Sequence, residues 1–188
     1  AFVNNSDWLI GSQNLNYNTD YKHTGEISTD QLKSLGVEYS IIGHYERVRD
    51  FNENAVIINN KLIAALDANI FPICFGENID DDYHEAIPKI LDKYLKDVEN
   101  IEFIIFAYEP IFAIGTGALP SKKRIEEVIS FVNEYLEDKY KKKPNLLYGG
   151  SVDSSNINDI INIEGINGVL VGDISSNIKE VERIIQSV

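Results

Sequence analysis

Short apolar runs alternate with amphipathic stretches along the whole chain of 188 residues. The runs carry no polar alternation and are rich in Ile, Val and Phe, which is typical of strands buried on both faces of a parallel sheet. They cover residues 8–13, 39–43, 70–75, 103–108, 145–148 and 168–172. Six strand-then-helix units therefore predict an α/β chain with a parallel sheet, either doubly wound or closed into a barrel. Periodicity alone does not choose between these two.

The stretches between the runs predict helices. Ser28-Thr29-Asp30-Gln31 resembles a capping box, and Gly36 is placed to end the helix that follows. Apolar residues recur at helical spacing over residues 56–68, 87–98, 120–136, 154–161 and 176–185. Since no linker or low-complexity segment interrupts the pattern, we expect residues 1–188 to belong to a single domain.

Composition excludes several classes of function. The one cysteine, Cys74, cannot form an internal disulfide, which favours a reducing compartment and a cytoplasmic location. We find neither a basic, apolar leader after Ala1 nor an apolar stretch of about 18 residues, so neither a signal peptide nor a membrane span is expected. A net charge of −13 argues against nucleic-acid or anionic-membrane binding. An anionic ligand would need backbone N–H groups or a well-placed cation.

Polar residues follow the predicted strands, where parallel βα folds place their sites. These strand ends are residues 13–14, 43–47, 76–77, 108–110, 148–151 and 171–173. A carboxylate and a histidine on neighbouring strand ends can transfer a proton beside a carbonyl group, and glycine turns can hold a phosphate. A small phosphorylated carbonyl compound is the predicted ligand. Singly, Glu46-Arg47 could be a structural ion pair and Gly149-Gly150 only a tight turn.

Two motifs resemble those of a known family. The run from Ala107 to Gly117, AYEPIFAIGTG, resembles the catalytic-base and lid sequence of the triosephosphate isomerase family. The run from Ile42 to Arg47, IGHYER, resembles the electrophile motif of that family. Supporting matches at residues 13–14, 24–28, 72–77, 147–152 and 168–172 follow in family order, so the resemblance covers nearly the whole chain.

The resemblance implies a (β/α)8 TIM barrel, of which this chain carries about six βα units, matching family strands 3 to 8. The first two units, at the N-terminal side, are expected to be missing from the 1–188 domain. The implied activity interconverts dihydroxyacetone phosphate and glyceraldehyde 3-phosphate in glycolysis and gluconeogenesis. The resemblance implies no cofactor and no metal, and a homodimer formed through the loop from Asn16 to Glu26.

The resemblance also implies roles for individual residues. Glu109 would be the catalytic base, His44 the electrophile and Glu46 an organiser of both. Tyr148 and Ser151 would receive the closed lid. The implied substrate-binding residues are Gly115, Ser151, Gly172 and Asp173, through backbone N–H groups, and Ile114 and Leu170, which would press on the base.

The chain departs from the family pattern at several positions. Tyr45 stands where the family usually has Ser, Asp173 replaces a glycine of the last phosphate loop, and Pro120 stiffens the lid hinge. No lysine matches the family's substrate-facing cation, so we expect these 188 residues alone to be inactive and the full-length protein to be active. The alternative is a truncated, catalytically silent relative that binds phosphate or a partner.

Overall fold

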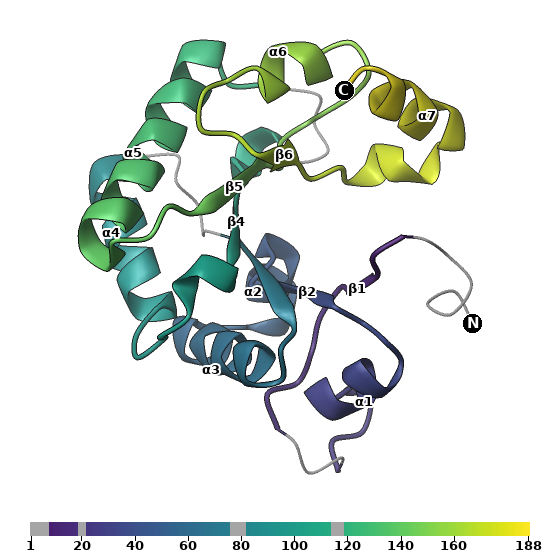
Figure 1. Ribbon diagram of the computed structural model, residues 1–188, viewed down its shortest axis with the longest axis vertical. Helices are drawn as coiled ribbons and strands as arrows, with labels where there is room; N and C mark the ends of the chain where they lie inside the picture. The colour runs from purple at the N-terminus through teal and green to yellow at the C-terminus, as the bar shows by residue number, and fades with distance from the viewer. Residues whose placement is uncertain (1–7, 19–21, 76–81, 114–118) are drawn as a thin grey trace. The chain divides into compact units, whose positions relative to one another are not determined.

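The computed structural model of the chain describes residues 8–18, 22–75, 82–113 and 119–188 (Figure 1). It divides into two compact units, Ala1–Glu77 with Lys89–Ile105 and Asn78–Pro88 with Phe106–Val188. Of the three break points, one falls within α4 (Tyr83–Tyr94), one falls at the start of β4 (Ile105–Tyr108), and one lies outside the described residues. The predicted α/β class, with six strands each followed by a helix, is confirmed.

The first unit contains strands β1 (Gly11–Ser12), β2 (Tyr39–Ile42) and β3 (Phe71–Phe75), paired in that order and parallel. Its helices are α1 (Thr29–Ser34), α2 (Tyr45–Phe51) and α3 (Ala55–Asp67), with a 3-10 turn at η1 (Ile101–Phe103). β1 is shorter than its apolar run predicts, and Trp8 and Leu9 remain 72% and 65% exposed.

The second unit contains β4, β5 (Asn145–Tyr148) and β6 (Gly168–Val169). β5 and β6 pair in parallel, and Gly149 N–H donates to the Tyr108 carbonyl at 2.9 Å, so the ends of β4 and β5 lie together. The helices are α5 (Lys122–Tyr140), α6 (Ile157–Ile161) and α7 (Ile178–Gln186), and the 3-10 turns are η2 (Ile111–Ala113) and η3 (Asp173–Ser176).

Several helix ends follow their sequence signals. Ser28 and Gln31 form the predicted capping box of α1, and Ser121 caps α5 through the N–H of Arg124 at 3.2 Å.

The buried face of α3 differs from its apolar pattern, because Lys61 lies on it while Val56 is 68% exposed. Helix α2 was not predicted at all. It begins directly after His44 and therefore determines how that residue is held.

Candidate functional site

His44 is the N-cap of α2. Its Nδ1 accepts a hydrogen bond from the backbone N–H of Glu46 at 3.3 Å, and its side chain is 22% exposed. Because Nδ1 uses its lone pair in this bond, the neutral ring carries its proton on Nε2. Burial lowers the pKa of His44, and the Glu46 carboxylate, 3.7 Å from Nδ1, opposes this only in part. The arrangement favours a neutral imidazole that can donate through Nε2.

Glu46 lies in the first turn of α2, and its side chain is 60% exposed. Its backbone N–H approaches His44 more closely than its carboxylate does. The predicted alternative, a structural ion pair between Glu46 and Arg47, is wrong because Arg47 Nε donates to Glu53 instead. Glu46 therefore acts on His44 mainly by fixing the ring, with a weaker electrostatic effect.

A buried charged cluster of Asn14, Arg47, Glu53 and Lys61, here named the Glu53 cluster, supports the start of α2 and of α3. Glu53 Oε1 accepts hydrogen bonds from Arg47 and, at 2.5 Å, from Lys61 Nζ, which also donates to Asn14 Oδ1 at 2.6 Å. Both side chains of the Lys61–Glu53 pair are about 5% exposed or less. Burial lowers the pKa of Lys61, and the Glu53 carboxylate offsets this effect in part.

Sequence reasoning missed the Glu53 cluster, although a signal for it exists. The buried face of α3 consists of Ile58, Lys61, Leu62 and Ala65. Lys61 follows Ile58 by three residues and precedes Ala65 by four, which is the spacing of one helix face. An ionisable group on an apolar helix face requires a charged or polar partner. The helical spacing therefore indicates a buried lysine, but it does not identify Glu53 as the partner.

Glu109 follows β4 and is 7% exposed. Gly149 lies against it, since a Cβ built on this glycine would lie 3.5 Å from Glu109 Oε1. The pKa of the neighbouring Tyr148 is raised by burial and, further, by Tyr108 and by Glu109. At Gly150 only glycine fits, because a Cβ there would lie 2.1 Å from the Tyr148 hydroxyl oxygen. The glycine pair thus permits close packing around Glu109 and Tyr148.

The segments after β5 and β6 carry three of the predicted phosphate-binding residues, Ser151, Gly172 and Asp173. Ser151 Oγ donates to the carbonyl of Ala113, at the end of η2. Leu170 N–H donates to the Tyr148 carbonyl at 2.8 Å, which holds the end of β6 beside the end of β5. Gly172 and Asp173 follow at the start of η3 and are both exposed.

The structure places the predicted residues in two groups. His44 and Glu46 belong to the first unit, whereas Glu109, Ser151, Leu170, Gly172 and Asp173 belong to the second. Ile114 and Gly115 lie outside the described residues. In the part of the chain that the structure describes, no three His, Cys, Asp or Glu side chains are grouped to hold a metal ion. Among the described helices, none is long and apolar enough to cross a membrane.

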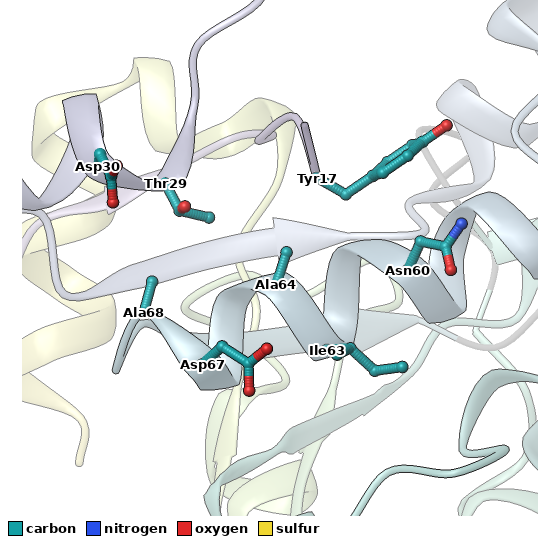
Figure 2. A pocket seen from close by; sticks show the side chains of 8 residues that line it. All are labelled: Tyr17, Thr29, Asp30, Asn60, Ile63, Ala64, Asp67 and Ala68. Atoms are coloured by element: carbon teal, nitrogen blue, oxygen red, sulfur yellow. The ribbon is translucent and has the colours of Figure 1, made fainter. Parts of the chain in front are cut away.

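A cavity of about 490 Å³ lies elsewhere in the first unit. Figure 2 shows Tyr17 and the start of α1 on one side of it and α3 on the other. None of the predicted site residues lines this cavity, and its two carboxylates, Asp30 and Asp67, come from different helices. It therefore contributes nothing to the candidate site.

Parallel strands that alternate with helices and carry polar groups at their carboxyl ends define the class of βα-repeat proteins. The family model described as triosephosphate isomerase matches residues 1–188. The chain is 37% identical to the triosephosphate isomerase of Alkaliphilus oremlandii over an alignment 187 residues long that covers 94% of this chain and 75% of the relative. It is 38% identical to that of a Wolbachia sp. from Brugia malayi, over 98% of this chain and 76% of the relative. The chain belongs to the triosephosphate isomerase family.

Proposed function

We propose that the protein carrying this chain interconverts dihydroxyacetone phosphate and glyceraldehyde 3-phosphate, as a cytoplasmic enzyme of glycolysis and gluconeogenesis. The observation that carries the proposal is the N-cap geometry of His44. A histidine whose Nδ1 accepts a backbone N–H keeps a neutral ring and presents Nε2–H as a donor. A neutral histidine at a helix N-terminus is the known electrophile of triosephosphate isomerases.

In the proposed reaction, the Glu109 carboxylate removes a proton from the carbon beside the substrate carbonyl. The electron pair of that C–H bond forms the C=C bond of an enediolate, and the carbonyl oxygen takes the negative charge. His44 Nε2–H donates to this oxygen, which stabilises the charge as it develops. A proton then passes from the hydroxyl group on the first carbon to the former carbonyl oxygen, with the His44 ring as the relay. Glu109 returns its proton to the carbon of the former carbonyl, which completes the conversion of the ketose into the aldose. Burial of Glu109 supports its role, because a poorly solvated carboxylate is a stronger base.

The phosphate of the substrate would be held by backbone N–H groups of Gly115, Ser151, Gly172 and Asp173. The exposure of Gly172 and Asp173 supports this, since their backbone is accessible to a ligand. A Cβ built on Gly172 would meet no atom within 4 Å, so the space beside it is open. Ile114 and Leu170 would cover Glu109 when substrate is bound, and Tyr148 and Ser151 would receive the lid.

The proposal also covers the domain to which the chain belongs and the dimer that it forms. We infer that the chain forms part of one TIM-barrel domain and dimerises through the loop from Asn16 to Glu26. The base of this loop is closed by a 2.9 Å hydrogen bond from Asn16 N–H to the Ile27 carbonyl. Gly25, near its end, has φ of +84°, a conformation that favours glycine. These features give the loop a defined base from which it can reach a second protomer.

The test is a coupled assay of isomerisation with the full-length protein and its variants. Glu109→Asp withdraws the carboxylate by one methylene, and we expect kcat to fall by at least about 100-fold. His44→Gln should lower kcat while leaving substrate binding within a fewfold. Residues 1–188 alone are expected to show no turnover, because no lysine matches the family cation. A full-length protein without isomerase activity, or a fully active Glu109→Asp variant, would disprove the proposal.

A further inference from the structure

Residues 151–156, here named the serine loop, are fixed by side chains of the loop itself. Asn156 Nδ2 donates to the Ser151 carbonyl at 2.9 Å, and Asn156 Oδ1 accepts from Asp153 N–H at 3.0 Å. Asp153 Oδ1 in turn accepts from the N–H groups of Ser155 at 2.8 Å and Asn156 at 3.2 Å. These local bonds define the shape of the loop, but they do not attach it to the rest of the second unit.

The N–H of Ser154, in the middle of the serine loop, attaches the loop to α7, in addition to the bond from Ser151 Oγ to the Ala113 carbonyl. It donates to Glu180 Oε1 in α7 at 2.8 Å, across 26 residues of sequence. Glu180 is 9% exposed, and its other oxygen accepts from Arg183 Nη1 at 2.9 Å. The hydrogen bond from Ser154 is the main cause of the lowered pKa of Glu180, so the carboxylate is ionised when it accepts the bond.

Glu180 is also connected to Gly172 through a short series of backbone hydrogen bonds. Ser175 N–H donates to the Gly172 carbonyl at 2.9 Å, and Asn177 N–H donates to the Ile174 carbonyl at 2.9 Å. Glu180 N–H then donates to the Asn177 carbonyl at 3.0 Å. The Gly172 turn and α7 are therefore one continuous hydrogen-bonded segment, and the Glu180 side chain extends from it to the serine loop.

We propose that Glu180 is a positioning residue that holds the serine loop in register with the Gly172 turn, so that the N–H groups of Ser151, Gly172 and Asp173 converge on one phosphate. This inference rests on the proposed function, since it takes these groups as the phosphate site. Glu180 does not contact the ligand and acts through Ser154. A single carboxylate thereby couples the loops that follow β5 and β6.

The direction in which phosphate affinity changes in Glu180 variants distinguishes a positioning role of this residue from a purely electrostatic one. A carboxylate in the same unit as a bound phosphate repels it, so a purely electrostatic role predicts tighter phosphate binding when the Glu180 charge is removed. Positioning predicts that binding depends on the reach of the side chain. Glu180→Gln keeps the acceptor oxygen in place and loses the charge. Glu180→Asp keeps the charge but withdraws the carboxylate from Ser154 by one methylene.

The experiment titrates inorganic phosphate into the ¹⁵N-labelled protein and follows the amide signals of Ser151, Gly172 and Asp173 by NMR at constant ionic strength. We expect Glu180→Asp to weaken phosphate binding by about tenfold, a change of about 1.4 kcal/mol, and Glu180→Gln to stay within about threefold of the wild type. Glu182, two residues further along α7, is exposed, so Glu182→Asp and Glu182→Gln are matched controls that should bind like the wild type.

Three results would overturn the inference. The first is unchanged binding in Glu180→Asp, and the second is stronger loss in Glu180→Gln than in Glu180→Asp. In both cases wild-type binding stands, so the phosphate site survives and only the role of Glu180 fails. The third is a wild-type protein whose Ser151, Gly172 and Asp173 signals do not respond to phosphate, which would remove the proposed phosphate site itself. Faster hydrogen exchange of the Ser154 amide in Glu180→Asp, with normal exchange in Glu180→Gln, is the expected supporting signature.

Discussion

The two units support their functional segments by different interactions. In the first unit, the helix capped by His44 is held by the buried Glu53 cluster, in which Arg47 and Lys61 share one carboxylate oxygen. In the second unit, the serine loop is held by bonds from side chains to backbone groups. The bonds of Asn156 join neutral groups, and those of Asp153 and Glu180 pair one carboxylate with neutral N–H donors and no buried partner charge. Charged groups away from water interact strongly but leave a costly unpaired charge when one partner is lost. Bonds between neutral groups are weaker and can be lost singly.

This difference predicts two modes of failure. Loss of one member of the Glu53 cluster should destabilise the first unit in a single large step, because the remaining charges stay buried. Loss of one bond in the serine loop should cost less, because the loop residues other than Val152 are half-buried or exposed, so water can reach groups that lose a partner. Unfolding measurements on single variants can contradict either expectation.

The largest expected effect is that of Lys61→Met. Methionine fills much of the volume of the lysine stem but leaves the buried Glu53 carboxylate with Arg47 as its remaining cation. We expect the free energy of unfolding to fall by about 3–5 kcal/mol, measured by urea denaturation at neutral pH. Lys33→Met alters an exposed lysine whose one hydrogen bond to the described residues goes to the Asn69 carbonyl, and it should change the free energy of unfolding by less than about 0.5 kcal/mol. Equal effects of the two substitutions would contradict the view that the Glu53 cluster dominates.

Asn156→Ala tests the second unit. It removes the acceptor for Asp153 N–H and the donor to the Ser151 carbonyl, two bonds between neutral groups. We expect the free energy of unfolding to fall by about 1–2 kcal/mol. Asn162→Ala removes a single exposed bond to the Asn158 carbonyl, at 2.7 Å, and is the matched control. A loss for Asn156→Ala as large as that for Lys61→Met would remove the distinction between the two units.

Sequence patterns predicted the elements better than the interactions that position the site. Buried parallel strands and amphipathic helices follow from periodicity, and the capping box at Ser28 follows from four consecutive residues. Helix α2 was missed because its residues are exposed or half-exposed and none is buried, so it shows no apolar face. Glu53 and Glu180 could not be assigned partners, because Lys61 and Ser154 lie 8 and 26 residues away and only the folded chain brings them together.

A smaller effect concerns pH and the first unit. The folded-state pKa of His44 is lowered below its ordinary value of 6.5, so the unfolded chain binds the proton more readily. The His44 contribution to stability is therefore fully present above pH 6.5 and is lost as the pH falls below it. His44→Asn keeps a helix-capping side chain but cannot titrate. We expect the wild type to lose more stability than this variant between pH 7.5 and about pH 5.5. Parallel stability curves for the two proteins would contradict the assignment.

The smallest expected change in stability is that of Tyr148→Phe. This variant tests whether a neutral buried group in the second unit, which makes no hydrogen bond to the described residues, can be removed at little cost. The Tyr148 hydroxyl is buried without a hydrogen-bond partner among the described residues. Its burial beside Glu109 raises its pKa, so the hydroxyl remains protonated and uncharged at neutral pH. Because the folded state gains no bond from this oxygen, its removal should leave the free energy of unfolding within about 1 kcal/mol of the wild type.

If Tyr148 receives the lid, the same variant should lower kcat in the coupled assay although its stability is unchanged. A variant that is both markedly less stable and fully active would show that the hydroxyl supports the fold and not the reaction, because neither buried packing nor the edge-to-face contact of the ring with Tyr108 requires that oxygen.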